Sequence, residues 1–353
     1  MKLFKAPYVV QKEILDNMQT SDLFWLSFVS KKIKNVIKSS QATRFKSIRS
    51  IVYDYVDQDQ RIIYIPSESG RDVIMVTFVI YKGKENHFLL NKYDKKIDFK
   101  CLSCDCPSIM SFNFCNKESV YKSIHYNFLD FFGDCVEYQW IINRYTSFFP
   151  QVKKLSLVLD FWRYEDNKAA KQELENVLSS SPLMTHIKLS YLGSAETLSP
   201  ESKFYKAGSV EIRQGNHIFP ANLRHFQGRQ ALLRCNICET LHLIELINRW
   251  KYGQAFQKLE YLKIIIDSHN VPENQVLNSI GIKYIDATKK PPAHTLPKLY
   301  FDFRLKPNTD PIISHSYVVR KTDNRVASVS IHRNELSFGV WDKTEEEFLS
   351  IVE

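Results

Sequence analysis

No stretch of this 353-residue sequence is long and apolar enough to cross a membrane, because the densest apolar run, residues 73–81, has only the length of a strand. A membrane-spanning helix needs about 20 such residues. Asn-x-Ser/Thr triplets are absent, and the N-terminus lacks the long apolar region of a secretory signal. We therefore expect a soluble chain inside the cell, in the cytoplasm or the nucleus, with no membrane partner.

Glycine and proline are scarce, at 10 and 13 residues, while 44% of the residues are hydrophobic and 25% are charged. This composition excludes a collagen-like or disordered chain. Seven cysteines, an odd number in a long chain, fit a reducing compartment better than a disulfide framework. The pairs Cys101/Cys104 and Cys235/Cys238 have a spacing found in zinc sites, but they lie far apart in the sequence, so we predict no metal site.

Motifs that bind phosphates or position a nucleophile are also missing, since the sequence contains no GxGxxG, GxxxxGK[ST], HExxH or GxSxG. The ten histidines are scattered, and His186 and His242 lie in apolar stretches, where a structural role is more common than a catalytic one. The acidic run 345–347 is typical of a solvated helix face. We therefore predict that the chain is not an enzyme, with no catalytic residue and no cofactor.

The net charge of +9 raises the question of nucleic-acid binding, because basic domains neutralise phosphates. The charge is local, however. Residues 1–46 hold nine Lys or Arg and three Asp or Glu, which accounts for six of the nine net charges. The many aromatic residues lie mostly in strand-like or helix-like patterns that core packing explains. These patterns do not favour nucleic acid as a partner.

Residues 7–38 have the spacing of three short helices. Pro7 suits the start of the first, the polar run 20–22 offers N-cap groups for the second, and Ser30 can cap the third. A unit of this size cannot bury all of its large apolar side chains by itself. Two explanations stay open, namely an exposed interaction surface and packing of the helices on the rest of the chain.

The order and spacing of residues in this segment resemble an F-box. The matching residues are Ala6-Pro7, Ile14-Leu15, Met18, Asp22-Leu23, Leu26, Val29-Ser30-Lys31 and Ile37. Ala6, Ser30 and Ile33 replace the leucine, cysteine and tryptophan that are usual in this motif, and they keep small or apolar character.

The resemblance implies that this segment docks on the Skp-type adaptor of a cullin–RING ubiquitin ligase. The positions that match the adaptor-facing or structural part of the motif are Pro7, Ile14, Leu15, Met18, Leu23, Leu26 and Val29. Some must form the core of the F-box, and the sequence does not divide the two sets. The lysines Lys31, Lys32, Lys34 and Lys38 fit electrostatic steering toward an acidic adaptor and, equally well, a solvated helix face.

The rest of the chain has a mixed α+β pattern. Residues 47–100 contain four alternating segments, which predict a small antiparallel sheet. These segments are residues 50–56, 61–65, 73–81 and 87–90. Helices are predicted over residues 121–132, 136–145, 169–178 and 240–250. Three segments, beginning at Val152, Met184 and Leu259, share one apolar spacing, which favours an irregular leucine-rich-repeat-like stack of strands and helices; an unrepeated α/β domain is the alternative.

The C-terminal part resembles the F-box-associated type 2 domain, which nematode F-box proteins carry after an N-terminal F-box. The resemblance rests on residues 248–253 leading into 259–262, on residues 319–331, and on Phe338-x-Val340-Trp341. Asn324 stands where this domain has glycine, a substitution that a turn tolerates. The two resemblances occur in the family's order and together span almost the whole chain.

Together they imply the substrate-recognition subunit of an SCF-type ubiquitin ligase. The F-box, residues 1–46, would bind the adaptor and, through it, cullin. A β-rich segment with helices, residues 47–148, would precede a repeat-like domain, residues 149–353, that captures a protein target. The sequence identifies neither the target nor the residues that bind it. The alternative is a non-catalytic interaction scaffold with a degenerate F-box, which the departures at Ala6, Ser30 and Ile33 favour.

Overall fold

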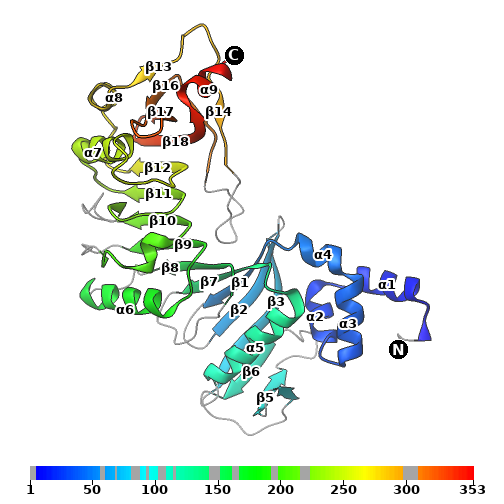
Figure 1. The fold of residues 1–353 in the computed structure, drawn as a ribbon. Coiled ribbons are helices and arrows are strands. Elements are labelled where there is room, and N and C mark those ends of the chain that lie inside the picture. Colours follow the sequence, from blue (N-terminus) through cyan, green and yellow to red (C-terminus); the bar gives the residue numbers. More distant parts are fainter. Residues whose placement is uncertain are drawn as a thin grey trace. The chain divides into compact units, whose positions relative to one another are not determined.

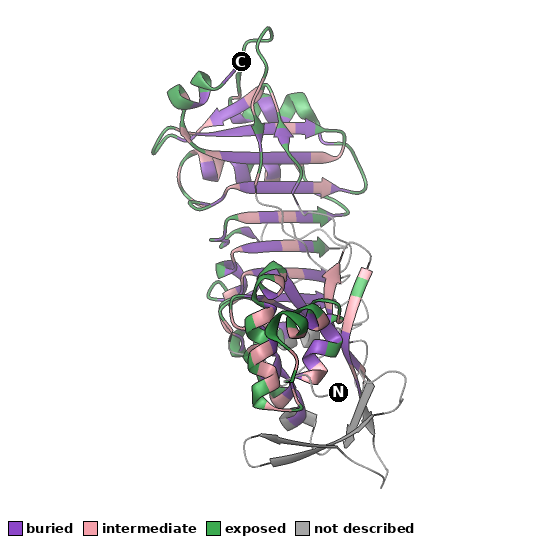
Figure 2. Ribbon diagram, turned by 90° about the vertical axis from the view of Figure 1, so that its right-hand side faces the viewer, coloured by how far each residue is buried: buried purple, intermediate pink, exposed green. Residues whose placement is uncertain are grey.

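The chain forms two compact units, residues 1–156 and 157–353, and the boundary falls inside strand β8 (Leu155–Asp160) (Figure 1). The computed structural model describes residues 5–55, 60–67, 70–80, 88–92, 95–101, 109–113, 117–142, 152–160, 167–191, 198–214, 223–296 and 309–353. The mixed α+β class is confirmed, with helices at the N-terminus followed by extensive β-structure. Figure 2 shows the buried residues concentrated on the strands, and the exposed ones on the N-terminal helices and on the loops that join the strands.

The first unit begins with four short helices. They are α1 (Tyr8–Asp16), α2 (Thr20–Leu26), α3 (Lys31–Ser40) and α4 (Ala42–Ser47). Ser30 caps α3 as predicted, since its side chain accepts a hydrogen bond from the Ile33 amide at 3.1 Å. The cap predicted for α2 is wrong. Gln19 holds the N-cap position, and the Thr20 hydroxyl instead accepts a hydrogen bond from Arg44. Helix α4 was not predicted.

The sheet of the first unit has the strand order β7-β1-β2-β3-β6-β5-β4. Its strands are β1 (Ser50–Tyr55), β2 (Gln60–Ser67), β3 (Gly70–Ile80), β4 (Phe88–Lys92), β5 (Lys95–Cys101), β6 (Ile109–Asn113) and β7 (Glu137–Ile142). The predicted antiparallel pairing is confirmed for β1 with β2 and for β2 with β3. By contrast, β6 runs parallel to β3, and β7 runs parallel to β1.

The helix predicted over residues 136–145 is wrong, because this stretch contains β7. Tyr138, Trp140 and Ile142 alternate along the strand and are at most 2% exposed. Aromatic and β-branched residues with a period of two favour a strand, and the parallel register with β1 places Trp140 beside Tyr53. The helix predicted over residues 121–132 is confirmed as α5 (Lys117–Phe132), and its Phe128 ring lies 5.9 Å from that of Tyr53.

The second unit contains a ladder of parallel strands with helices between them. In chain order, the elements of this ladder are β8, α6 (Asn167–Ser180), β9 (His186–Tyr191), the 3-10 helix η3 (Lys203–Lys206), β10 (Ser209–Gln214), β11 (Gln230–Cys235), α7 (Thr240–Lys251) and β12 (Tyr261–Ile266). His186, Ser209, Gln230 and Tyr261 are in register across β9 to β12. The three strands and two helices predicted here are present, whereas β10 and β11 were missed.

Antiparallel strands follow this ladder. The remaining elements are α8 (Glu273–Ile280), β13 (Lys283–Tyr284), β14 (Ala293–His294), β15 (Ile312–Ile313), β16 (Ser316–Val319), β17 (Arg325–His332), β18 (Glu335–Thr344) and α9 (Glu345–Ser350). Strand β18 pairs with both β12 and β17. The acidic run opens α9, where Thr344 and Glu347 form a capping box; Glu345 is not simply solvated, because it binds Lys283 at 2.7 Å.

A buried arginine organises the turn between β16 and β17. Arg320 is 2% exposed and donates to both carboxylate oxygens of Asp323, at 2.8 and 2.5 Å. Its guanidinium also lies 5.1 Å from the ring of Trp250 on α7. Asn324, at the tip, has a φ of 59°, a left-handed conformation that asparagine adopts more readily than most residues. Residues 320–324 therefore form a tight turn that a buried ion pair stabilises.

Candidate functional site

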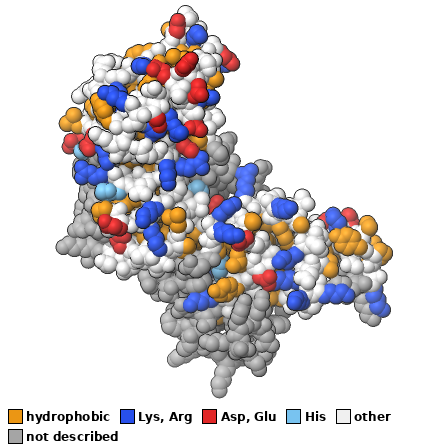
Figure 3. Space-filling model, viewed as in Figure 1, with side chains coloured by type: hydrophobic (Ala, Val, Ile, Leu, Met, Phe, Trp, Pro, Cys, Tyr) orange, Lys and Arg blue, Asp and Glu red, His pale blue; other side chains and the backbone are white. Residues whose placement is uncertain are grey.

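Helix α1 presents consecutive apolar residues to solvent. Tyr8, Val9 and Val10 are 56%, 76% and 45% exposed, and the preceding Pro7 is exposed as well. We call these four residues the α1 face. Within α1, only Leu15 is buried. Figure 3 shows hydrophobic side chains gathered on the surface over α1, and an exposed apolar group of this kind marks an interaction site.

The structure divides the seven F-box positions into a core set and a surface set. Leu15 and Leu23 are 0% exposed. The half-buried positions are Ile14, Met18 and Leu26. Pro7 is exposed, and Val29, in the loop after α2, is 69% exposed. Leu15 and Leu23 therefore stabilise the helices, whereas Pro7 and Val29 are accessible to a partner.

Sequence reasoning did not include Tyr8, Val9 and Val10 among the predicted site residues, although the sequence carries a signal for them. Successive residues of an α-helix are about 100° apart around its axis. Three adjacent apolar residues in a short helix therefore cannot all face one core. The run that follows Pro7 could have been identified on this ground as partly exposed.

Helix α4 fixes the corner between α1 and α2. Arg44 donates one hydrogen bond to the Met18 carbonyl at 2.8 Å and another to the Thr20 hydroxyl at 2.9 Å. Gln41, which is 2% exposed, donates to the Asp16 carboxylate at 2.5 Å. These bonds join the end of α1 to the start of α2, and they hold the α1 face in place without using its side chains.

The opposite side of the helical group packs on the rest of the first unit. Phe24 of α2 is 0% exposed, with ring centroids 4.3 Å from Phe128 and 5.5 Å from Phe131 of α5. The indole nitrogen of Trp25 donates to the Ile74 carbonyl of β3 at 3.2 Å. Both explanations left open for the apolar excess therefore apply, because α2 packs on the chain while α1 remains exposed.

The four lysines of α3 are in two different environments. Lys34 forms an ion pair with Asp130 of α5, and Lys38 donates to the Asp130 carbonyl at 2.7 Å. Lys31 and Lys32 are exposed, and they border an open hollow of about 600 Å³ on the outer side of α3. Lys34 and Lys38 thus attach α3 to α5, whereas Lys31 and Lys32 lie at exposed positions beside the hollow.

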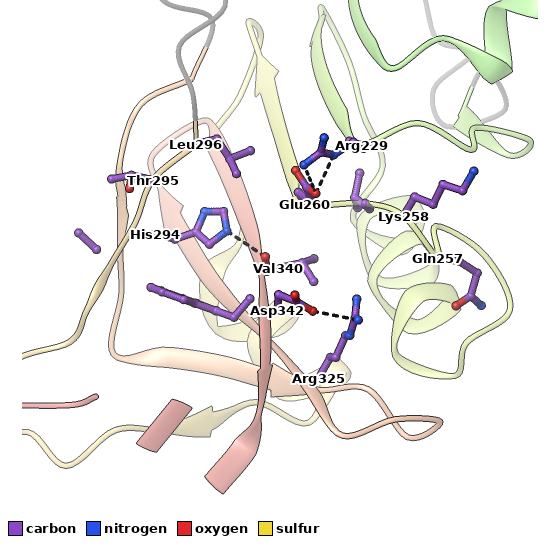
Figure 4. A pocket seen from close by; sticks show the side chains of 13 residues that line it. Arg229, Gln257, Lys258, Glu260, His294, Thr295, Leu296, Arg325, Val340 and Asp342 are labelled. Carbon is purple, nitrogen blue, oxygen red and sulfur yellow. Dashed lines mark hydrogen bonds and ion pairs between the residues drawn. The ribbon is translucent and has the colours of Figure 1, made fainter. Parts of the chain in front are cut away.

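The second unit has a pocket of about 650 Å³ between the start of β12, strand β14 and strand β18 (Figure 4). Its charged groups are largely paired. Arg229 binds Glu260 at 2.6 Å, and Arg325 binds Asp342 at 2.9 Å. Because both acids are held in ion pairs, the chemistry of the pocket favours recognition of a ligand rather than proton transfer.

His294 forms the inner wall of this pocket and is 4% exposed. Its Nε2 lies 2.9 Å from the Val340 carbonyl (Figure 4), so this nitrogen carries the proton and donates. Burial lowers the pKa of His294, which keeps the ring neutral. The ring fits closely against Gly339, where an added Cβ would lie 2.8 Å from two of its atoms. His294 therefore acts as a packed structural residue.

The other residues weighed for chemistry have structural environments. Burial lowers the pKa of His186 to about 4. Cys235 and Cys238 are buried free thiols, and the side chains of Cys101 and Cys104 lie outside the described residues. Among the described residues, no group of three or more His, Cys, Asp or Glu side chains is placed to hold a metal ion.

In the comparison with protein families, residues 7–45 match the F-box domain. The match contains all seven predicted positions, helices α1 to α3 and most of α4. Comparison with curated proteins and with solved structures gives no match. Across the described part of the chain, none of the helices has the length and apolar character needed to cross a membrane.

Proposed function

We propose that this chain recruits a protein target to an SCF-type cullin–RING ubiquitin ligase, as its target-recognition subunit. F-box domains bind Skp-type adaptors within SCF complexes, and residues 7–45 are such a domain. The observation that carries the proposal is the α1 face, an apolar surface inside this domain. It remains exposed although α2 of the same domain is packed on α5 and β3.

The chemistry of docking follows from the division of the F-box residues. A few apolar anchors carry most of the energy of a protein interface, and the exposed candidates are Pro7, Tyr8, Val9, Val10 and Val29. Lys31 and Lys32 add positive charge that would accelerate association with an acidic adaptor. Leu15 and Leu23 would act indirectly, by keeping the helices folded beneath this surface.

We assign target capture to residues 149–353, as a nematode-type F-box-associated type 2 domain with a leucine-rich-repeat-like arrangement. Support comes from the in-register parallel strands β9 to β12 and from the Arg320–Asp323 turn within the resembling segment. The pocket beside His294 offers a recessed surface with paired charges at its rim. Under this proposal, residues 47–148 form the support on which the F-box, residues 1–46, packs.

The proposed role needs no chemistry from this chain, because F-box proteins are typically non-catalytic and other subunits of the ligase transfer ubiquitin. The two acids of the pocket are engaged with arginines, which agrees with a binding role. A scaffold with a degenerate F-box is the competing proposal. One of its supports, Ser30 in place of cysteine, has a structural reason, since Ser30 caps α3.

Adaptor binding by surface variants separates the two proposals. Val9→Asp places a charge on the α1 face at a residue that is 76% exposed, so the chain should stay folded. We expect at least a tenfold loss of affinity for a purified Skp-type adaptor. Leu241→Asp is the matched control, because Leu241 is a 68% exposed apolar residue on α7, and its affinity should be unchanged. An unmodified chain that does not bind the adaptor would instead support the degenerate F-box.

A further inference from the structure

A buried arginine of the first unit has no carboxylate partner among the described residues. Arg61 of β2 is 7% exposed, yet none of the ion pairs found in the described part of the chain includes it. Arginine is almost never buried without a partner, because its charge is costly to remove from water. Arg320, the comparably buried arginine of the second unit, has Asp323.

The register of three adjacent strands explains what surrounds Arg61. Tyr55 of β1 and Thr77 of β3 are its direct partners on either side, so the three side chains share one face of the sheet. Helix α5 covers this face with Tyr121. The Arg61 guanidinium carbon lies 3.6 Å from the ring centroid of Tyr55 and 3.0 Å from that of Tyr121. These rings attract the cation, but tyrosine is uncharged near neutral pH and does not balance the charge.

A small cavity adjoins the guanidinium. The space open to the centre of a water-sized sphere is about 10 Å³, so the cavity can take one particle somewhat larger than a water molecule. It is lined by Tyr53, Arg61, Ile63, Thr77, Tyr121, Ile124 and Trp140. Two lining groups that can donate hydrogen bonds, Arg61 Nε and Thr77 Oγ1, are buried and have no hydrogen-bond partner in the described structure. The cavity therefore combines a positive charge, two hydrogen-bond donors that have no partner in the described structure, and room for one small ion or molecule.

We propose that this cavity binds one halide ion, chloride under ordinary conditions, between β2, β3 and α5. A water molecule could accept from the same two donors, but it would leave the guanidinium charge unbalanced. A carboxylate or phosphate ion is too large for the space. The bound ion stabilises the packing of α5 on the sheet, and α5 is also the helix on which the F-box packs through Phe24.

Chloride dependence of stability tests this site in the full chain. Sodium chloride is exchanged for sodium gluconate at constant ionic strength, since gluconate is too large to enter. We expect the unfolding temperature to rise by about 4 °C for each tenfold increase in chloride above its dissociation constant. Bromide should act like chloride. An unfolding temperature that does not respond to the exchange overturns the proposal.

Matched arginine variants connect the effect to the cavity. Arg61→Met keeps the length of the side chain and removes its charge, so it should abolish the chloride response. Arg71→Met is the control, because Arg71 lies on β3 beside the ring of Tyr64 and has a carboxylate partner, Asp54, at 3.5 Å. It should keep the full response. Equal responses in Arg61→Met and the unmodified chain would overturn the proposal.

Crystallography gives a readout that does not require Arg61→Met to fold. Crystals of the unmodified chain are soaked in sodium bromide, and anomalous scattering is measured at the bromine edge. We expect a bromide peak within contact distance of Arg61 Nε and Thr77 Oγ1. A cavity with density of one water and no anomalous signal would show that water is the occupant and would overturn the proposal. The site is independent of adaptor binding, so its failure leaves the proposed function unaffected.

Discussion

Helices α1 and α2 come from the same short domain and have similar apolar content, yet their environments differ. Phe24 of α2 is 0% exposed among the aromatic rings of α5, whereas Val9 of α1 is 76% exposed. Apolar content alone therefore does not distinguish a structural helix from a docking helix. The distinction depends on what the remainder of the chain places against each one, here α5 and β3 for α2.

The largest expected effect on stability comes from a substitution in α2, the packed helix of this comparison. Phe24→Ala should lower the free energy of unfolding by about 3–5 kcal/mol, because it leaves a cavity among Phe128, Phe131 and Phe132. Tyr8→Ala, on the exposed side, should change it by less than about 0.5 kcal/mol. Chemical denaturation of both variants measures the difference, and equal losses would contradict the assigned environments.

Acid should weaken the first unit through buried His125 and the second unit through buried His186 and His294. Burial lowers the pKa of His125 and of His186 from 6.5 to about 4. The unfolded chain therefore binds protons that the folded chain excludes, so stability is complete above pH 6.5 and falls as the pH drops toward 4. His125 and His186 each contribute up to about 3 kcal/mol to this loss.

Denaturation at a series of pH values between 7 and 4.5 measures the acid effect. Replacing His186 with Gln should reduce the loss in the second unit, where His294 keeps its share, and leave that of the first unit unchanged, with His125→Gln as the reciprocal variant. Segment-resolved hydrogen exchange distinguishes the units. A pH profile that neither substitution alters would show that these histidines are not the source.

A smaller effect should come from the cap of α3. Ser30→Ala removes the hydrogen bond from the Ile33 amide and should lower the free energy of unfolding by about 1 kcal/mol. Ser39→Ala is the control, since Ser39 is exposed and its hydroxyl donates to the Val36 carbonyl of its own helix. Its effect should lie within about 0.5 kcal/mol. A Ser30→Ala variant as stable as the control would remove the structural reason for serine at this position.

The smallest effect concerns the attachment of α3 to α5. Asp130→Asn removes the carboxylate that pairs with Lys34, a contact at the surface, and should cost at most about 1 kcal/mol. If the outward charge of α3 steers association, the same change should raise the rate of adaptor binding at low salt, because Lys34 is released. Stopped-flow association at several ionic strengths measures this, and an unchanged rate would argue against steering.

Local patterns were sufficient to predict much of the fold, because they are fixed by neighbouring residues. Helices α1, α3, α5, α6 and α7 and the alternating strands β1 to β3 follow from periodicity and caps, as with Ser30. Residues 136–145, which contain β7, were wrongly predicted to be helical, because their aromatic residues fit the period of a helix as well as that of a strand. A parallel strand is decided by its partner, here β1, which lies far away in the sequence.

The candidate site was predictable in part. The motif located Pro7 and Val29, but it did not separate them from Leu15 and Leu23, because which residues are covered depends on packing between helices. Helical geometry could have identified residues 8–10 of α1 as partly exposed. No sequence pattern predicts the environment of Arg61, since it arises from pairing among three strands and from the position of α5.

Hydrogen exchange of the full chain with and without a Skp-type adaptor tests the central claim, that the α1 face is the docking surface, most directly. The account predicts slower exchange over residues 8–16 and in the loop at Val29 when the adaptor is bound. It predicts no change in α5 or in the strands β9 to β12. Binding that leaves α1 unprotected and protects another segment would contradict the claim.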